Sequence, residues 1–455
     1  MKKERKYFGT DGIRGVASVP PLDPESMVRL GKALAQIFVR TKGKKHRILI
    51  GKDTRLSGYM LETSIAAGLT CMGADVLLSG PIPTPGVAYL TKSMRADAGV
   101  MISASHNSYE DNGIKIFAAD GYKLPDEKEF EIESLMETGV LDEKSAAATE
   151  IGKAQRINDA VGRYTVFLKG CFPRDLSLEG MKIGLDCANG AGYVVAPQVF
   201  SELGAEVISR GISPNGRNIN AGFGSLFPEV SSKLVSEYSL DFGLSLDGDG
   251  DRACLIDERG TLIDGDLILG ICARDLAERG LLRKGKVVAT VMSNLGLEKF
   301  LAPFGVEVER AAVGDRYVLE LMLKGEIQLG GEQSGHVIFS DLATSGDGIL
   351  SALQVLAVML RKGQPLSKLC EGFVRFPQKL VNVEVSKKIP LDSIVPLQLL
   401  ISKKQKELGD NGRILVRYSG TENKVRVMVE CDSEDACKRH TADLVEVIQR
   451  EIGAL

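Results

Sequence analysis

A strand–helix–strand pattern occurs three times along this chain of 455 residues. Each copy starts with a short apolar run that predicts a buried strand, continues with a segment of helical length and reaches a second short strand. A glycine separates helix and second strand in each copy, at a point where helices commonly end in a left-handed residue. This alternation is typical of βαβ units and of a largely parallel sheet. The copies cover residues 48–76, 182–207 and 286–308, with the glycines Gly73, Gly204 and Gly305.

Each copy then reaches a further apolar run that ends in an unusual polar loop. In open α/β sheets, ligands bind beyond the carboxyl ends of the strands. We therefore expect three related domains that each supply one loop to a shared cleft. The loops are Ser103–Asn107, Asp247–Asp251 and Gly330–His336.

The sequence after Phe376 and Pro377 is organised differently. Strands are expected at 381–385, 413–417 and 424–431, and helices at 391–408 and 434–452. This order, with a tight connection between the last two strands, predicts a small α+β domain. The predicted fold is three related α/β domains with mixed, mostly parallel sheets and a smaller C-terminal α+β domain. We expect the domains at residues 1–155, 156–258, 259–373 and 374–455.

The composition excludes several classes of protein. Apolar residues make up 44% and charged residues 26% of the chain, which is the balance of a globular protein. The formal net charge of −3 does not indicate bulk binding of nucleic acid or of an anionic membrane. The sequence predicts neither a membrane span nor a signal peptide, and its eight scattered cysteines, without a CxxC pair, fit free thiols in a reducing compartment. We expect a cytoplasmic protein that binds neither nucleic acid nor membrane.

The loop Asp247–Asp251 has the pattern of a metal site. Its three carboxylates alternate with glycines, which let the backbone turn until Asp247, Asp249 and Asp251 converge. Clustered carboxylates repel one another unless a cation neutralises them, and hard oxygen ligands suit Mg²⁺ or Ca²⁺. A calcium loop of the EF-hand type is disfavoured, because Arg252 stands where that loop needs glycine. A solvated acidic turn is the other alternative, and the metal site is favoured over it.

The loop Ser103–Asn107 offers a serine beyond a buried strand. A serine hydroxyl is a poor nucleophile unless a base or a cation assists it. With four histidines in the chain and no marked triad partner, hydrolytic triad chemistry is disfavoured. If the serine carries a phosphate, the metal of the acidic loop can neutralise it, and phosphoryl transfer then needs mainly alignment. A Ser/Asn-rich turn without chemistry stays open on this motif alone.

The segment Arg417–Arg426 predicts a phosphate clamp. Two hydroxyls, an accessible glycine backbone and two guanidiniums can donate several charge-assisted hydrogen bonds to one dianion. The alternative is an exposed basic hairpin. Near the start, Phe8–Gly15 could be another anion-facing loop or a set of turn residues. We interpret His336 as a loop histidine and Cys254 as a core thiol.

Together these segments resemble the α-D-phosphohexomutase superfamily, over nearly the whole chain. Its four signatures occur in the family's order at Ser103–Asn107, Asp247–Arg252, Gly331–His336 and Arg417–Asn423. Each signature alone is modest, but four in order are highly specific. Within the superfamily, the segments Phe8–Arg14, Ser103–Ser105 and Gly331–Ser334 are similar to the bacterial phosphoglucosamine mutase branch. Phosphomannomutase/phosphoglucomutase relatives typically carry Thr in place of Ser103 and Met or Leu in place of Gln333.

The resemblance implies a four-domain, heart-shaped enzyme around a central cleft. Its activity would interconvert glucosamine 6-phosphate and glucosamine 1-phosphate, on the route to UDP-N-acetylglucosamine. Mg²⁺ would be the cofactor, and glucosamine 1,6-bisphosphate the intermediate and activator. The partner would be a phosphosugar substrate, and a homodimer stays open. Phosphomannomutase/phosphoglucomutase is the alternative activity.

The resemblance also implies a role for individual residues. Ser105 would carry the phosphate and contribute to the metal site. Lys115 is the candidate general acid/base, and His106 and Arg14 would line the same site. The remaining roles are metal binding by Asp247, Asp249 and Asp251, sugar binding by Glu332 and Ser334, and binding of the non-reacting phosphate by Arg417, Ser419, Gly420, Thr421 and Arg426.

Two departures from the family pattern concern loop stiffness. Ser108 stands where the family usually has proline after the asparagine, and Asn423 stands where proline usually follows Thr-Glu. Both remove a rigid residue from a loop rather than a reactive group.

Two other functions stay open as alternatives to the mutase. They are a Mg²⁺-dependent phosphatase and a non-catalytic phosphosugar sensor.

Overall fold

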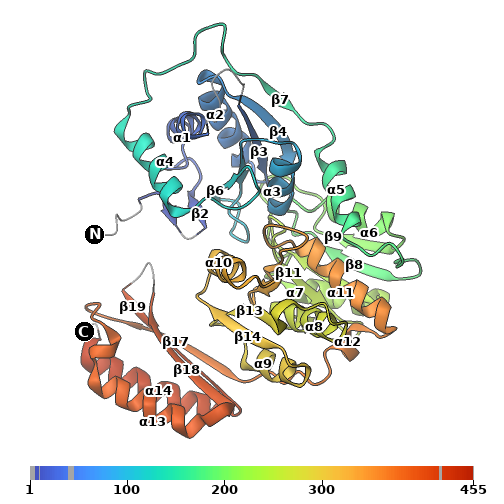
Figure 1. Ribbon diagram of the computed structural model, residues 1–455, viewed down its shortest axis with the longest axis vertical. Helices are drawn as coiled ribbons and strands as arrows, with labels where there is room; N and C mark the ends of the chain where they lie inside the picture. The colour runs from blue at the N-terminus through green and yellow to red at the C-terminus, as the bar shows by residue number, and fades with distance from the viewer. Residues whose placement is uncertain (1–5, 10, 39–45, 420–422, 454–455) are drawn as a thin grey trace. The chain divides into compact units, whose positions relative to one another are not determined.

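The computed structural model, drawn in Figure 1, describes residues 6–9, 11–38, 46–419 and 423–453. These residues form two compact units. One is built from residues up to Met292 together with Phe304–Glu371, and the other from Ser293–Pro303 together with the chain from Gly372 onward. Of the four sheets formed by the described residues, the first unit holds three and the second holds one.

The first sheet has the strand order β1–β2–β6–β5–β3–β4–β7. Strand β3 runs parallel to its neighbours β4 and β5, and the central strand β5 runs antiparallel to β6. In this order the strands are β1 (Phe8–Gly9), β2 (Gly12–Val16), β6 (Asp111–Ala118), β5 (Ala98–Ile102), β3 (Arg47–Lys52), β4 (Asp75–Pro81) and β7 (Ala154–Arg156). The helices of this part are α1 (Pro24–Ile37), α2 (Ser57–Cys71), α3 (Thr84–Ser93) and α4 (Asp126–Thr138).

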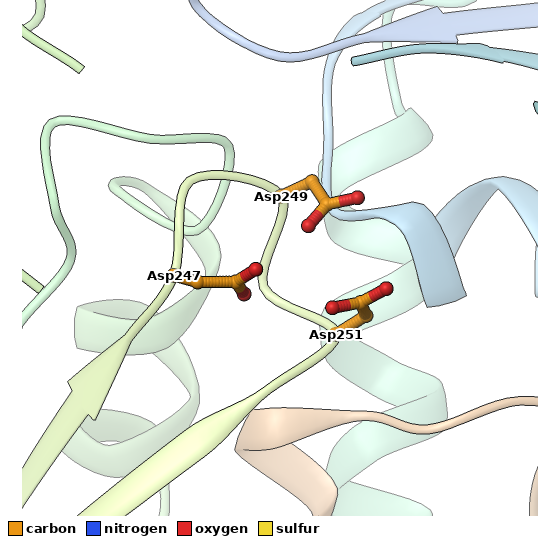
Figure 2. Close-up of side chains that lie close together, drawn as sticks. All are labelled: Asp247, Asp249 and Asp251. Atoms are coloured by element: carbon orange, nitrogen blue, oxygen red, sulfur yellow. The ribbon is translucent and has the colours of Figure 1, made fainter. Parts of the chain in front are cut away.

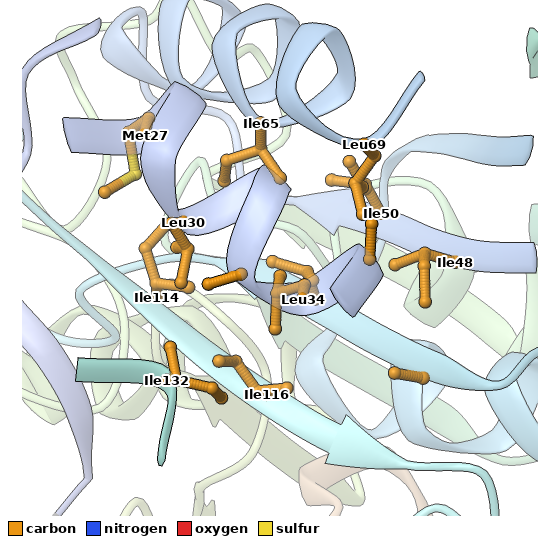
Figure 3. Packing of buried hydrophobic residues seen from close by; sticks show 14 of the residues in the cluster. Met27, Leu30, Leu34, Ile48, Ile50, Ile65, Leu69, Ile114, Ile116 and Ile132 are labelled. Atoms are coloured by element: carbon orange, nitrogen blue, oxygen red, sulfur yellow. The ribbon is translucent and has the colours of Figure 1, made fainter. Parts of the chain in front are cut away.

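The core of this first part lies between the sheet and the helices α1, α2 and α4. Side chains alternate along a strand, so Ile48 and Ile50 of β3 share one face. Figure 3 shows this face packed beneath α1 and α2, where Leu34 of α1 is fully buried. The two helices cross at glycines: a Cβ on Gly31 would lie 2.9 Å from the Cα of Gly68. This close packing fixes the layer from which the polar loops extend.

The second and third sheets repeat the strand order of the first. The orders β9–β8–β10–β11 and β14–β13–β15–β16 correspond to β4–β3–β5–β6, with the first three strands parallel and the last antiparallel. The second sheet contains β12 (Leu262–Ile263), β11 (Ala253–Ile256), β10 (Phe242–Leu246), β8 (Lys182–Asp186) and β9 (Glu206–Arg210), with helices α5 (Ala160–Gly170), α6 (Val195–Glu202) and α7 (Pro228–Tyr238). The third contains β14 (Glu307–Ala311), β13 (Lys286–Thr290), β15 (Leu329–Gly331) and β16 (Val337–Phe339), with helices α8 (Gly265–Glu278), α10 (Asp315–Gly325), α11 (Gly348–Lys362) and α12 (Leu366–Leu369).

The threefold repeat predicted from the sequence is therefore confirmed, and its strand boundaries are sharpened. The separating glycines adopt positive φ angles of 89° at Gly73, 104° at Gly204 and 67° at Gly305. The second strands β4, β9 and β14 begin at Asp75, Glu206 and Glu307, later than the sequence predicted, because the glycine turn comes first. The domain boundaries between the repeats stay predictions.

The second unit is the predicted small α+β domain. Its antiparallel sheet has the order β17–β19–β18 and is covered by the helices α13 and α14. The helix α9 (Leu295–Leu301) also belongs to this unit, where the backbone N–H of Leu295 donates to Glu430 at 3.0 Å. This helix ends at Leu301, because Pro303 lacks a backbone N–H and the chain continues as a 3₁₀ turn over Ala302–Phe304. The bounds are β17 (Gln378–Glu384), β18 (Gly412–Tyr418), β19 (Lys424–Cys431), α13 (Val395–Leu408) and α14 (Glu434–Ile452).

Two further observations bear on the environment of the chain. All eight cysteines are free thiols. Within the part of the chain that the structure describes, every helix is too short or too polar to cross a membrane.

Candidate active site

Three loops at equivalent positions of the three repeats meet in the first unit. The serine loop (Ser103–Asn107) joins β5 to β6, the Asp loop (Asp247–Arg252) joins β10 to β11, and the sugar loop (Glu332–His336) joins β15 to β16. The hydroxyl of Ser105 donates to Asp247 at 2.6 Å, and the ring of His336 lies 3.7 Å from Asp251. The first and third loops thus both contact the second, as expected for loops at the carboxyl ends of related sheets.

The Asp loop directs three carboxylates at a common point. Figure 2 shows Asp247, Asp249 and Asp251 facing one another from a tight turn, and one oxygen of each lies within 4.8 Å of the others. All three side chains are buried. Within the described residues, Asp249 and Asp251 each keep one buried oxygen, Oδ1, without a hydrogen-bond partner.

Burial and mutual repulsion control the charge of this triad. Burial, followed by the neighbouring carboxylates of Asp249 and Asp251, raises the pKa of Asp247 well above its usual value. Burial is the largest single influence on Asp251 and opposes its ionisation, but Lys115, His336 and Arg252 together outweigh it and hold the pKa of Asp251 well below its usual value. The protein alone therefore does not stabilise three negative charges here.

The donor set fits a divalent cation. Oxygen ligands without thiolate or imidazole suit Mg²⁺, which binds through a few carboxylates and keeps other positions for water or phosphate oxygens. The two buried carboxylate oxygens that lack a hydrogen-bond partner could coordinate such an ion. Residues Asp247, Asp249 and Asp251 could hold it, with the Ser105 side chain within reach.

Ser105 has a backbone conformation that is uncommon for a residue with a side chain. Its φ angle is 53°, in the left-handed region, and its side chain is almost fully buried. The ring Nδ1 of His106 lies 3.3 Å from the Ser105 Oγ and 3.1 Å from a guanidinium nitrogen of Arg252. Because Arg252 can only donate, this nitrogen is an acceptor. Burial, then the charges of Arg252 and Arg14, lowers the pKa of His106.

The cations predicted for the site are Lys115 and Arg14, and both lie beside it. The ammonium of Lys115 on β6 is 2.9 Å from Asp249 and 3.2 Å from Asp251. Burial alone would lower the pKa of Lys115, but the charges of Asp11, Asp249 and Asp251 raise it well above its usual value, so the side chain stays protonated. Arg14 on β2 donates to the carbonyl of Ala104 at 3.0 Å, next to Ser105.

A chain of charges that the sequence did not reveal extends from this site. The ammonium of Lys123 bridges Asp11 and Asp315, at 2.5 Å to each. Asp315 in turn lies 3.6 Å from the ring of His336. These residues are far apart in sequence, so no local pattern marks them; the signal available was their position near strand ends.

His336 lies in a loop, as predicted, but its contacts extend beyond that loop. Its side chain is buried, and its Nε2 accepts a hydrogen bond from the backbone of Gly346 at 3.1 Å. The Nδ1 side therefore faces Asp251, and although burial lowers the pKa of His336, its interactions with Asp251 raise it overall. The residue connects the sugar loop to the carboxylate triad.

The two predicted sugar-binding residues differ in their surroundings. Glu332 is half-buried and accepts a hydrogen bond from the backbone N–H of Gly314 at 3.0 Å, whereas Ser334 is exposed. The loop turns at Gly335, whose φ angle is 92° and where a Cβ would lie 2.0 Å from the carbonyl oxygen of Ala253. Glycine is therefore required there, and it seats the sugar loop against β11.

The structure describes part of the predicted phosphate clamp (Arg417–Arg426), which belongs to the second unit. Arg417 of β18 and Arg426 of β19 are directly paired across the two strands and are half-buried. Burial, then the charge of Arg426, lowers the pKa of Arg417. Ser419 donates its backbone N–H to Lys424, and Lys388 donates to the Ser419 carbonyl at 3.1 Å. Gly420 and Thr421 lie outside the described residues.

Comparison with known families matches this chain along most of its length. Four models of phosphoglucomutase/phosphomannomutase domains match in order: alpha/beta/alpha domain I over residues 5–142, domain II over 163–260, domain III over 264–376 and the C-terminal domain over 380–447. The phosphoglucosamine mutase of Geobacter metallireducens is 55% identical over 449 residues, covering 99% of both chains. That of Syntrophotalea carbinolica is 52% identical over 453 residues, covering 100% of this chain and 99% of the relative.

Solved structures share the fold at lower identity. A phosphoglucomutase/phosphomannomutase family protein from Burkholderia thailandensis has a TM-score of 0.78 at 22% identity, covering 97% of this chain and 98% of its own. Aspergillus fumigatus N-acetylphosphoglucosamine mutase, solved in complex with GlcNAc-6P and magnesium, has a TM-score of 0.67 at 17% identity, covering 99% and 96%. Taken with the four domain matches, these similarities show that the chain belongs to the phosphoglucomutase/phosphomannomutase family of α-D-phosphohexomutases.

Proposed function

We propose that the chain interconverts glucosamine 6-phosphate and glucosamine 1-phosphate by passing a phosphoryl group between Ser105 and the sugar. Full-length relatives at 52–55% identity are named phosphoglucosamine mutase, which supports the reaction. The observation that best supports the mechanism is the 2.6 Å hydrogen bond from the Ser105 hydroxyl to Asp247 of the buried triad. Since Ser105 donates its proton to a carboxylate and not to His106, its surroundings favour a phosphate carrier over a hydrolytic serine.

The proposed cofactor is Mg²⁺, held by Asp247, Asp249 and Asp251 together with an oxygen of phosphorylated Ser105. When bound, the ion would neutralise charge on the transferring phosphoryl group. The residues themselves align the group: Asp247 is in contact with the Ser105 Oγ, and Thr84 fixes Asp249 by a 2.6 Å hydrogen bond.

In the forward half-reaction, the P–O bond to Ser105 breaks as a new P–O bond forms to the free hydroxyl of the bound monophosphate. The product is glucosamine 1,6-bisphosphate, which reorients without leaving and returns its other phosphoryl group to Ser105. The attacking hydroxyl loses a proton and the departing Ser105 oxygen gains one, and Lys115 would exchange both: it would give its proton to the serine oxygen and take up that of the hydroxyl. Arg14 and His106 line the same site and contact the serine loop.

Recognition of the sugar and of the non-reacting phosphate completes the proposal. Glu332 and Ser334 would bind sugar hydroxyls, and Glu332 is held in place by the Gly314 backbone. The paired guanidiniums of Arg417 and Arg426 suit a phosphate dianion, because planar forks donate two hydrogen bonds each. Ser419, Gly420 and Thr421 would add hydroxyl and backbone donors.

The test offers glucosamine, glucose and mannose 6-phosphates to the Mg²⁺-loaded enzyme with a trace of bisphosphate and follows the products by ³¹P NMR. We expect glucosamine 1-phosphate to form fastest. Faster turnover of mannose or glucose 6-phosphate would instead indicate a phosphomannomutase/phosphoglucomutase. Release of inorganic phosphate would identify a phosphatase, and binding without any product would identify a sensor.

We also propose a cytoplasmic location and leave a homodimer as a hypothesis. The free state of all eight cysteines supports a reducing compartment. Light scattering coupled to size-exclusion chromatography measures the molar mass in solution and would decide between monomer and dimer.

A further inference from the structure

The serine loop is held by two side chains from outside it that no part of the mechanism above uses. Arg55 follows β3 in the first repeat, and Asn220 lies in the connection between β9 and α7 of the second repeat. Arg55 is fully buried and Asn220 nearly so. Both side chains end at the backbone of the serine loop, not at the carboxylate triad.

The two side chains donate to the same pair of carbonyl oxygens. One guanidinium nitrogen of Arg55 donates to the carbonyl of Asn107 at 2.6 Å and to that of Ser105 at 3.2 Å. The amide nitrogen of Asn220 donates to the same two carbonyls, at 2.9 Å each. Guanidinium and carboxamide groups each offer several donors in a fixed plane, so each can bridge two acceptors.

The opposite side of the Ser105 peptide is held as well. The backbone N–H of Ser105 donates to the Ser103 hydroxyl at 2.9 Å, and that hydroxyl donates to Asp53 at 2.5 Å. Asp53 also forms a buried ion pair with Arg55. The backbone N–H and C=O of Ser105 are therefore both engaged, which leaves its side chain directed at Asp247.

This arrangement explains how Ser105 keeps its backbone conformation. A φ angle of 53° is unfavourable for a residue with a Cβ, and such a conformation persists only where the surroundings impose it. The Asp loop closes the remaining space: a Cβ on Gly248 would lie 2.6 Å from the Ser105 carbonyl oxygen. The Arg55 Nε also lies 3.4 Å from the carbonyl of Ser108, the position where the family usually has proline.

We propose that Arg55 and Asn220 are positioning residues for phosphoryl transfer, because their shared hydrogen bonds to the Ser105 and Asn107 carbonyls fix the direction of the Ser105 Oγ toward the metal site. The inference rests on the proposed function, in which Ser105 is the carrier. Neither residue touches the reacting atoms. Loss of either should misplace the carrier without changing how the sugar binds.

The test measures single-turnover transfer from the phosphorylated enzyme to glucosamine 6-phosphate. We expect Asn220→Ala and Arg55→Lys to lower the transfer rate about 10- to 100-fold. The sugar concentration that gives half the maximal rate should change less than about threefold. Asn220→Asp should be slower than Asn220→Ala, because a carboxylate would face two carbonyl oxygens. Asn218→Ala, in the same segment but bonded to Ser213 and Asn215, is the matched control and should transfer at the wild-type rate.

Rates are expressed per phosphorylated Ser105, measured by intact-protein mass, and thermal unfolding checks the fold of each variant. A wild-type rate in Asn220→Asp overturns the inference, even if Arg55→Lys fails to fold. Loss of activity that only follows the folded fraction also overturns it, since that is the result of a purely structural role. Failure of the phosphorylated wild-type enzyme to transfer to any sugar would instead contradict the proposed function itself.

Discussion

The serine loop and the Asp loop occupy the same topological position and are stabilised in opposite ways. Each joins the third strand of its repeat to an antiparallel fourth, β5 to β6 and β10 to β11. The serine loop has its carbonyls satisfied by cationic and amide donors, Arg55 and Asn220. The Asp loop keeps two buried carboxylate oxygens without a hydrogen-bond partner among the described residues. The protein satisfies the first loop with its own donors, whereas the second has a set of oxygen ligands that a cation would suit.

The difference shows how one repeated architecture distributes a reaction. Strand order fixes where a loop emerges, but the residues behind the loop decide what it can carry. In the proposed mechanism the serine loop carries the side chain that forms and breaks a bond, whereas the Asp loop brings together three buried carboxylates. Substitutions in the two loops should therefore impair the enzyme in different ways. The predictions below run from the largest expected effect on activity to the smallest.

The largest effect is expected from removing the carrier. Ser105→Ala should lower mutase turnover at least about 10⁴-fold, since no other group can form the covalent intermediate. Steady-state rates with glucosamine 6-phosphate measure this. Ser64→Ala, whose hydroxyl bonds only to the Met60 carbonyl of its own helix, is the control and should be unaffected. Full activity of Ser105→Ala would remove the distinction between the two loops.

Removing a charge from the Asp loop should have the next largest effect. Asp251→Asn should lower kcat about 10²- to 10³-fold and raise the Mg²⁺ concentration needed for activity. Chelation of the wild-type enzyme should abolish turnover, and added Mg²⁺ should restore it. Asp257→Asn, a buried carboxylate that accepts from backbone N–H groups of a turn, serves as control. An unchanged Mg²⁺ dependence in Asp251→Asn would argue against the metal role.

The clamp of the second unit should affect binding more than chemistry. Arg417→Ala removes one of two paired guanidiniums, and we expect KM to rise about 10- to 100-fold because a charge-assisted hydrogen bond is lost. kcat should change less than about threefold. The exposed Arg450→Ala variant is a control for loss of positive charge alone. An unchanged KM in Arg417→Ala contradicts the phosphate-binding role.

The smallest effect on activity is expected behind the Asp loop, at the start of α11. Asp347 caps this helix and accepts from the Tyr164 hydroxyl at 2.5 Å, and the next residue, Gly348, donates its N–H to the Gly250 carbonyl at 3.0 Å. Burial raises the pKa of Asp347 to about 6. The folded protein therefore holds this proton where the unfolded chain has lost it, so the stabilisation is complete below about pH 4 and is lost as pH rises through 6.

The Asp347→Asn variant should not lose stability as pH rises through 6, because its amide does not titrate. Near pH 3 the variant and the wild type should unfold at similar temperatures, whereas at pH 7 the variant should be more stable, by about 3 kcal/mol. Activity at pH 7.5 should stay within about twofold, since Asp347 does not reach the reacting atoms. Thermal unfolding of both proteins across this pH range measures the difference. Parallel pH curves would show that the carboxyl titrates normally.

The sequence predicted the repeat and the reactive loops because both follow local rules. Apolar runs, helix-length segments and left-handed glycines mark each βαβ unit, and α14 matches its predicted bounds of 434–452. Convergence of Asp247, Asp249 and Asp251 follows from alternate spacing with glycine. The second strand of each repeat begins later than predicted, because the residues at and after the glycine form a turn that the apolar pattern does not reveal.

The residues that sequence reasoning missed act through tertiary contacts. Lys123 and Asp315 were not named from the sequence, and they form a chain with His336 between elements far apart in sequence. Arg55 could have been predicted by the rule that identified Ser105, that functional residues lie beyond the carboxyl ends of strands, because it also follows a buried strand. Its charge gave no sign that it would bind the backbone of another loop.

The most direct test of the central claim follows the phosphoryl group itself. The enzyme is labelled with ³²P-bisphosphate, the labelled peptide is mapped, and the labelled enzyme is then mixed with glucosamine 6-phosphate. The account predicts label on Ser105 that moves to the sugar at the rate of turnover. Label on another residue, or label that leaves Ser105 as inorganic phosphate in the presence of sugar, would contradict it.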